Sequence, residues 1–317
     1  MEARQRVEPT DVDKENAQEA HRLVRSFLET DSTLKEYEVD TTLIGSYARQ
    51  VSIRRVKDVD ALCKLPGLMG TVDSSEILSS ILDLLDEEFK DARVTPQDRS
   101  IKVKFPDFDM HVDVVPARTA GSYLEIPDGE GGWLETNPEK FTELTKKMNL
   151  RYDDRYVPLV KLIRQTRRTC LGKRPGGFLF EVMTYHACDA GIASTSDAAL
   201  YAGALRSIAT QLGSLAAGGL VPDPTRPGST INVRATELQL ATAATKFATV
   251  AGNAESAFAE NDRCSSARQF CAILGKNADD EWVFGVPADC NEDGTARKLS
   301  VTMPGDRFVP AGDGRFA

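Results

Sequence analysis

The sequence predicts an α+β protein, with a mixed α/β first half followed by a mainly helical second half. Before about residue 153, segments with the alternating pattern of strands are interspersed with amphipathic helical segments, and after it the pattern is mainly helical. The last forty or so residues are rich in Gly, Pro and Asp, which predicts irregular structure or a tail. We therefore expect a core over residues 1–152, a helical unit over 153–275 and an irregular segment over 276–317.

Each expected element rests on periodicity and on its end signals. Helical segments place apolar residues three and four positions apart, and strand segments alternate apolar with polar residues. The expected helices are residues 13–30, 73–90, 154–170, 176–191, 196–217 and 233–262. The expected strands are residues 37–44, 58–65, 100–105 and 109–117.

The charge of the chain limits its partners. The 317 residues carry a formal net charge of −9. Proteins that bind a long phosphate backbone usually collect Lys and Arg, because neutralising phosphates supplies most of the non-specific affinity. The acidic balance argues against a long nucleic-acid track and is compatible with a small basic pocket for one or two nucleotides.

Composition also gives an expected compartment. No apolar run approaches the roughly 20 residues needed to cross a bilayer, and the first residues lack the apolar centre of a secretion signal. We therefore expect a cytoplasmic protein without a membrane partner. The six cysteines contain no Cys-x-x-Cys pair, and only three histidines accompany them, so we expect buried or inert thiols and no zinc framework.

Three aspartates form the most informative pattern. Asp58 and Asp60 are two residues apart in an expected strand, so their side chains project from one face, roughly 7 Å apart. Asp113, between Val112 and Val114 of another expected strand, should point to the same kind of polar face. Three carboxylates on adjacent strands predict a hard-oxygen site for two Mg²⁺ ions, with Mn²⁺ as the alternative. Such ions stabilise the attacking and leaving oxygens in phosphoryl transfer.

Gly45 and Ser46 supply the second motif, at a strand end that opens a short helix. Backbone N–H groups and a hydroxyl at such a turn can approach the triphosphate of a donor nucleotide. Each motif alone also fits a surface acidic pair or an ordinary helix start. Their combination, in this order and strand context, favours a nucleotide-transfer site.

The segments GSYARQVSIRRVKDVD (residues 45–60) and HVDVVPA (111–117) resemble the signature of the DNA polymerase β-type nucleotidyltransferases. Within that superfamily the chain is most similar to the CD-NTases of bacterial CBASS anti-phage systems, which are related to cyclic GMP–AMP synthase and oligoadenylate synthetase. Residues 132–144, 221–233 and 261–275 are similar to further segments of those enzymes. The zinc-binding insertion of the animal DNA sensor is missing, so a double-stranded DNA activator is not implied.

This resemblance implies a polymerase β-like core joined by a spine helix to a helical substrate-binding domain like that of oligoadenylate synthetase. It implies metal-dependent synthesis of a cyclic di- or oligonucleotide messenger from NTPs, ATP above all. Asp58 and Asp60 would bind both metals, and Asp113 would bind the metal that activates the hydroxyl. The implied partners are CBASS regulatory proteins, or conjugating proteins that act on the C-terminal Ala317.

The helix expected over residues 154–170 has a basic face formed by Lys161, Arg164 and Arg168. In the resembling enzymes a lysine on the spine helix contacts donor phosphate, and Lys161 is the matching position. A solvated charged face is the alternative interpretation.

Other polar residues near the motif have less defined roles. His111 should share a strand face with Asp113. We expect it to be packed or supporting rather than a base, because alignment of the hydroxyl on metal leaves little need for one. Three basic residues before the aspartates either contact phosphate or face solvent, namely Arg54, Arg55 and Lys57.

Three other functions fit parts of the pattern. A template-independent RNA polymerase or tRNA-end nucleotidyltransferase has the same aspartates but needs a basic RNA track, which the net charge disfavours. A small-molecule nucleotidyltransferase, such as an antibiotic adenylyltransferase, suits an acidic protein and would need its acceptor to form product. A non-enzymatic nucleotide-binding module is least favoured, because all three carboxylates are present.

Overall fold

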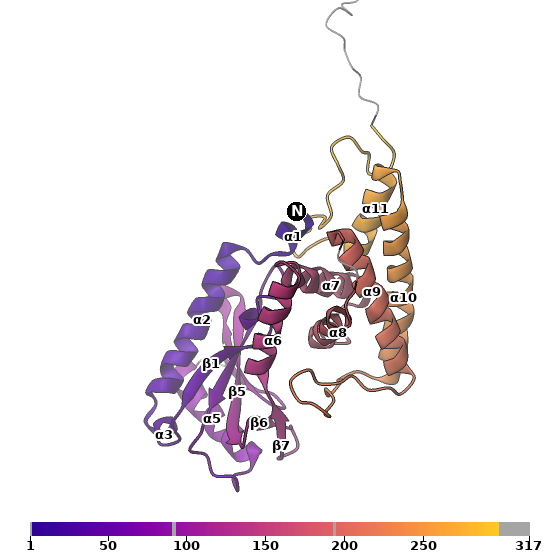
Figure 1. Cartoon of the computed structure of the whole chain (residues 1–317). Helices are drawn as coiled ribbons and strands as arrows, with labels where there is room; N and C mark the ends of the chain where they lie inside the picture. The colour runs from indigo at the N-terminus through magenta and orange to yellow at the C-terminus, as the bar shows by residue number, and fades with distance from the viewer. Residues whose placement is uncertain (1, 91–92, 193–194, 298–317) are drawn as a thin grey trace, which may run out of the picture.

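The computed structural model of the chain describes residues 2–90, 93–192 and 195–297. In this part of the chain, a half built on a β-sheet lies beside a half built from helices (Figure 1). The prediction of an α+β protein is thus confirmed.

The helices begin at recognisable signals. α2 begins at Asp11, two residues before the expected start, because Thr10 and Asp13 form a capping box. α6, which the hydropathy pattern did not predict, follows an Asn137 cap and starts with Pro138. The described helices are α1 (Glu2–Val7), α2 (Asp11–Thr30), α3 (Ser32–Lys35), α4 (Gly45–Ala48), α5 (Ser74–Phe89), α6 (Pro138–Arg151), α7 (Tyr156–Leu171), α8 (Gly177–Asp189), α9 (Asp197–Ala216), α10 (Glu237–Ala259) and α11 (Arg263–Leu274), with a 3₁₀ turn η1 (Pro106–Phe108).

The sheet joins strands that are distant in the sequence. Its order is β1-β2-β5-β4-β3, and β6 and β7 continue from β5. β2 and β5 run parallel, and the other paired strands are antiparallel. The described strands are β1 (Asp40–Ile44), β2 (Asp58–Lys64), β3 (Val94–Pro96), β4 (Ile101–Phe105), β5 (Met110–Ala120), β6 (Tyr123–Pro127) and β7 (Trp133–Thr136). The four expected strands are present, and the short strands β3, β6 and β7 were not predicted.

One face of the sheet is apolar and packs against α2 and α5. Val59 of β2 and Val112 of β5 are fully buried in one cluster with apolar residues of these two helices. Strand side chains alternate between faces, so the neighbouring Asp60 and Asp113 point to the opposite face of the sheet. The helices that bury one face thereby leave the aspartate face available for a site.

The helical half has its own apolar core around α7. Ile163, Phe180 and Phe247 are fully buried in it, and Val7 of α1 and Phe141 of α6 belong to the same cluster. This core therefore includes residues on both sides of the expected boundary at residue 152, and α6 connects the two halves. Across the described residues, no helix is both long and apolar enough to span a membrane.

Residues 276–297 contain isolated β-bridges and no helix or strand. Within them, Cys290 forms a disulfide with Cys264 of α11. The expectation that all six cysteines are thiols is wrong for this pair. The segment after α11 brings the two Cα atoms to 5.4 Å, which their separation of 26 residues does not reveal. The other cysteines are free thiols, namely Cys63, Cys170, Cys188 and Cys271.

Candidate active site

The three predicted aspartates lie on two neighbouring strands. Asp58 and Asp60 are on β2, and the parallel register places Asp113 of β5 directly opposite Asp60. Asp58 lies opposite His111 in the same register. The strand alternation expected from the sequence is present, because Val59 between the two aspartates is fully buried. One face of the sheet therefore carries all three carboxylates.

Asp60 is in close contact with the backbone of Gly45. A Cβ atom added to Gly45 would lie 1.7 Å from Asp60 Oδ2, and the φ of Gly45 is +76°, which L side chains rarely adopt. Both facts require glycine at this position. Ile44, the last residue of β1, pairs with Asp60, and the chain turns into α4 directly after it. The Gly-Ser motif thus forms one wall of the Asp60 site.

A cavity of about 570 Å³ opens at this wall. Its volume is in the range of small-molecule sites, which are commonly about 300 to 1,000 Å³. Gly45, Ser46, Asp58 and Asp60 line it, and Asp113, though described, is outside its lining. Four of the six site residues predicted from the sequence therefore line one cavity.

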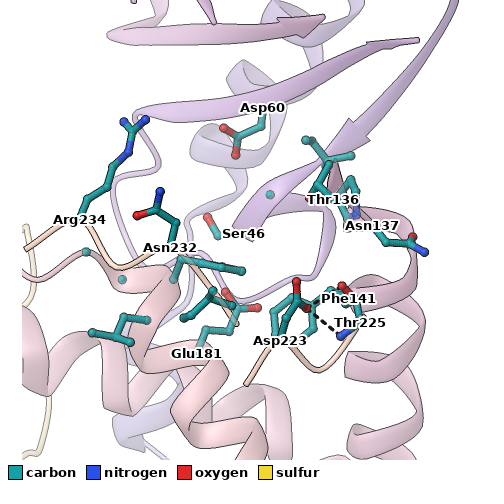
Figure 2. A pocket seen from close by; sticks show the side chains of 18 of the residues that line it. Ser46, Asp60, Thr136, Asn137, Phe141, Glu181, Asp223, Thr225, Asn232 and Arg234 are labelled. Atoms are coloured by element: carbon teal, nitrogen blue, oxygen red, sulfur yellow. Dashed lines mark hydrogen bonds between the residues drawn. The ribbon is translucent and has the colours of Figure 1, made fainter. Parts of the chain in front are cut away.

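The helical half and the loop between α9 and α10 supply much of the remaining wall. Figure 2 shows Glu181 of α8, Phe141 of α6 and the loop residue Asp223 across the cavity from Asp60. Asp223 Oδ1 accepts hydrogen bonds from the backbone N–H of Thr225 at 2.8 Å and from its hydroxyl at 2.7 Å. These bonds hold the loop in place. Because the sheet half supplies one wall and the helical half another, the cavity lies between the two halves of the molecule.

Asp60 has an unusual electrostatic environment. Burial raises its pKa, the carboxylates of Asp58 and Asp113 raise it further, and the value reaches about 7. Arg49 and Arg164 act in the opposite direction. The ionised form of Asp60 is therefore disfavoured until a positive charge reaches these carboxylates.

Asp113 is also poorly satisfied. Its Oδ1 is buried and has no hydrogen-bond partner in the described part of the chain. Its Oδ2 lies 3.7 Å from His111 Nε2. Burial is the largest cause of the raised pKa of Asp113 and of the lowered pKa of His111. His111 therefore lies beside the carboxylate, as expected from their shared strand face.

The donor set suits a hard divalent cation. Carboxylate oxygens are the preferred ligands of Mg²⁺, and the buried unpartnered oxygen of Asp113 calls for a positive partner. Within residues 2–90, 93–192 and 195–297, no three acidic, His or Cys side chains are already gathered into a group that could hold a metal ion. The residues therefore fit a metal in donor type and charge, and their side chains would have to converge on it.

A buried ion pair joins the motif helix to the helical half. Arg49, the residue that caps the C-terminal end of α4, donates from Nε to Glu181 Oε1 at 2.5 Å and from Nη2 to Oε2 at 3.1 Å. Arg164 Nη1 of α7 is 3.7 Å from the same carboxylate. The Arg49 guanidinium also lies over the Phe141 ring, 5.0 Å from its centre. Two guanidinium groups share one carboxylate, so a net positive charge remains beside Asp58 and Asp60.

Lys161 lies elsewhere. Its buried ammonium pairs with Glu8, and it is outside the cavity lining. Burial lowers the pKa of Lys161, and Glu8 opposes this shift. Arg164, on the same helix, does line the cavity.

The basic residues before the aspartates also form ion pairs outside the cavity. Arg54 Nη1 is 2.8 Å from Glu281 Oε2, and Arg55 pairs with Asp279. The ammonium of Lys57 lies 2.7 Å from Asp109 Oδ2. None of these three residues lines the cavity.

The sequence prediction missed most of the cationic wall. Isolated arginines carry no recognisable pattern, and these residues come from the C-terminal cap of α4 and from three separate loops. Only Arg164 was noted, as part of a basic helix face. The cavity arginines are Arg49, Arg99, Arg164, Arg174, Arg226 and Arg234.

Sequence comparison connects this geometry to known enzymes. Residues 2–149 match the Second Messenger Oligonucleotide or Dinucleotide Synthetase (SMODS) domain. The chain is 29% identical over 286 residues to the cyclic AMP-AMP-AMP synthase of an Acinetobacter species, and the alignment covers 85% of this chain and 81% of that relative.

Solved structures share the fold across both halves. Escherichia coli CdnC with ATP is 18% identical with a TM-score of 0.70, covering 89% of this chain and 96% of CdnC. The CdnC complex with HORMA-deltaN is also 18% identical, with a TM-score of 0.68 over 86% and 94% of the two chains. The CD-NTase CdnG of Bradyrhizobium diazoefficiens with GTP is 17% identical, with a TM-score of 0.66 over 86% and 95%. The chain thus matches the SMODS domain over residues 2–149, is similar over most of its length to a cyclic oligonucleotide synthase, and shares the fold of the CD-NTases.

Proposed function

We propose that this protein is a CD-NTase that joins ATP, alone or with a second NTP, into a cyclic oligonucleotide in a reaction that requires divalent metal. The observation that carries the proposal is the meeting of Asp58, Asp60, Gly45 and Ser46 at one cavity, with Asp113 opposite Asp60 in the sheet. Carboxylates for metal and a glycine-containing turn for phosphate are the two groups that nucleotidyl transfer needs.

In this reaction a ribose hydroxyl of the acceptor attacks the α-phosphorus of the donor NTP. A new O–P bond forms, the bond from the α-phosphorus to the oxygen that bridges to the β-phosphate breaks, and pyrophosphate leaves. The hydroxyl proton goes to solvent. Ser46, which lines the cavity and whose hydroxyl lies 2.9 Å from that of Ser52, would bind the donor phosphates.

Charge compensation is shared between metal and protein. Mg²⁺ or Mn²⁺ ions, held by Asp58, Asp60 and Asp113, would neutralise phosphate charge and activate the hydroxyl. Arg49 and Arg164 add fixed positive charge at the same end of the cavity, where they partly offset the acidic cluster. Fixed charges of this kind need no reorganisation during the reaction.

The relatives support the choice of substrate and setting. The name of the Acinetobacter relative, cyclic AMP-AMP-AMP synthase, supports ATP as substrate and adenosine as a base of the product. The CdnC complex with HORMA-deltaN supports a regulatory protein as partner. We infer that the messenger serves bacterial anti-phage defence of the CBASS type. The predicted conjugation through Ala317 stays a prediction, since that residue lies outside the described residues.

Substitution of the carboxylates tests this proposal. Asp58→Asn, Asp60→Asn and Asp113→Asn should each lower product formation from ATP at least about 100-fold, a loss typical of removing a group that stabilises transition-state charge. Chromatography of the nucleotide products measures it, with thermal unfolding as the check of folding. Asp11→Asn is the matched control, because Asp11 is exposed on α2 and pairs only with Lys14 among the described residues. Near-normal turnover in a folded Asp60→Asn variant would overturn the assignment.

A further inference from the structure

Several cavity arginines lie apart from the aspartates. Arg99 is in the loop between β3 and β4, Arg174 is between α7 and α8, and Arg234 comes just before α10. We call these three residues the far arginine cluster. Figure 2 shows Arg234 beside Asn232 on one side of the cavity, with Asp60 and Ser46 further toward the middle of the view.

Among the described residues, no ion pair with a buried carboxylate neutralises the far arginine cluster. Arg99 donates from Nε to the Asp128 carbonyl at 2.9 Å, and Arg174 donates from Nη1 to the Arg234 carbonyl at 3.2 Å. Neither forms an ion pair with a carboxylate in the part of the chain that the structure describes. Arg234 Nη1 is 3.5 Å from Asp98 Oδ2, but the Asp98 side chain is 76% exposed, so solvent weakens this pair.

The members of the cluster also act on one another. Burial lowers the pKa of Arg99 and the neighbouring charge of Arg234 lowers it further, while the nearby carboxylates of Asp128, Asp98 and Glu130 raise it. By contrast, Arg226, on the same loop as Arg234, is neutralised by its ion pair with Glu135. Two like charges held together in a cavity wall are stabilised when an anion binds between them. Planar guanidinium groups bind phosphate oxygens through paired hydrogen bonds.

We propose that Arg99, Arg174 and Arg234 form a second phosphate site, which binds the 5′-triphosphate of the acceptor nucleotide and then that of the linear intermediate. This proposal rests on the proposed function. It adds where the 5′-triphosphate of the acceptor, which does not react in the first transfer, is bound. After the first transfer the intermediate still carries its 5′-triphosphate, while the donor triphosphate requires the carboxylate end. Two polyphosphates in one cavity repel each other, so separate cationic sites are needed to hold both.

This site predicts phosphate binding that does not depend on metal. The probe is inorganic tripolyphosphate, and calorimetry measures its binding. EDTA removes divalent metal, and without metal the carboxylates repel an anion, so binding to them is not measured. Arg234→Gln should weaken binding about tenfold or more, and Arg99→Gln should do the same, while Arg99→Lys should retain part of the affinity. Arg22→Gln, which removes an equal charge from the exposed face of α2, is the matched control and should bind like wild type. Equal affinity in wild type, Arg234→Gln and Arg99→Gln would overturn the site.

A second comparison assigns the site to the acceptor. In EDTA, a linear adenosine dinucleotide with a 5′-triphosphate should bind wild type about tenfold more tightly than the same dinucleotide with a 5′-hydroxyl. Arg234→Gln should remove most of that difference. A difference that persists in Arg234→Gln would refute the assignment. Failure of the proposed function is distinguishable, because a wild type that makes no cyclic product could still show metal-independent tripolyphosphate binding that the variants lose.

Discussion

The Asp60 side chain is enclosed by the backbone of Gly45 and by two other carboxylates. Its pKa is raised to about 7, so in the metal-free protein ionisation of Asp60 opposes folding. Because the folded-state pKa of Asp60 is higher than its unfolded-state pKa, Asp60 contributes less to the stability of the folded protein as the pH rises. With an unfolded value near 3.8, the wild type loses stability as the pH rises from about 4 to about 7. The arrangement is useful only when cations bind there.

This reasoning predicts a stability gain in an inactive variant. In EDTA, Asp60→Asn should have a higher free energy of unfolding than wild type, by roughly 2 to 4 kcal/mol at pH 8 and by less at pH 5, because Asn cannot ionise. Urea unfolding at the two pH values measures the difference. Addition of Mg²⁺ should reduce it, since the cation stabilises the wild-type carboxylates. A difference equal at pH 5 and pH 8 would contradict the account.

Lys161 provides a second test at a single side chain. Its predicted contact with donor phosphate requires the ammonium to leave Glu8 when NTP binds. Lys161→Ala should then raise the KM for ATP by a factor equivalent to about 1.5 to 3 kcal/mol, the range for a hydrogen bond to a charged group. Glu8→Gln is the matched control, because it removes the same ion pair and keeps the ammonium. An unchanged KM in both variants would assign Lys161 to the Glu8 contact alone.

The sequence predicts the face of a strand from which a side chain projects better than it predicts which distant residues that side chain meets. Strand alternation predicts that Asp58 and Asp60 share a face, because that follows from local geometry. The opposition of Asp60 and Asp113 depends on the register between strands about fifty residues apart, which no local pattern fixes. The contact of Lys161 with Glu8 depends on where α1 and its following residues pack, and α1 was not predicted.

The short helix α4 is fixed to α8 by the buried pair of Arg49 and Glu181. The Glu181 side chain is 0% exposed and that of Arg49 is 5% exposed, so water does not solvate either charge. Removing one partner of such a pair typically costs about 3 to 5 kcal/mol, because the other charge stays buried. The pair therefore holds the Gly-Ser turn against the helical half.

We expect Glu181→Ala to lower the free energy of unfolding by about 3 to 5 kcal/mol. A double variant, Arg49→Met with Glu181→Leu, should recover part of that loss, because it removes both charges of the pair and leaves Arg164 beside Asp58 and Asp60. Denaturant unfolding measures both effects. Glu255→Ala is the matched control, since the pair of Glu255 with Arg206 is exposed and should be worth at most about 1 kcal/mol. A Glu181→Ala variant as stable as the control would show that the pair does not hold the halves together.

Elements with strong periodicity were predictable, and elements fixed by packing were not. α2, α5 and α7 carry apolar stripes, and they lie within two residues of the expected ranges. β6 and β7 are short. The pairing of β6 with β5 and of β7 with β6 is set by the hairpin turns that connect them. α6 is polar overall, but Asn137 followed by Pro138 was a usable start signal that periodicity alone overlooks.

The molecule as a whole combines an acidic chain with a cavity lined by six arginines and five carboxylates. The net charge of −9 disfavours a long polynucleotide, while six arginines gather at one cavity between the two halves. Net charge could be read from the sequence, but the gathering depends on how the sheet half and helical half pack. A second bound nucleotide is the acceptor that this charge distribution favours. A linear product held in the same cavity then has its own ends at high effective concentration, which favours ring closure.

The product formed from NTPs alone tests this account most directly. The purified protein is incubated with all four NTPs and Mg²⁺, without primer or other acceptor, treated with phosphatase, and its products are analysed by mass spectrometry. The account predicts a phosphatase-resistant product that contains adenosine and whose mass equals a whole number of nucleoside monophosphates, each less one water, as ring closure requires. A product that stays phosphatase-sensitive, or that forms only after tRNA or a small acceptor is added, would contradict it.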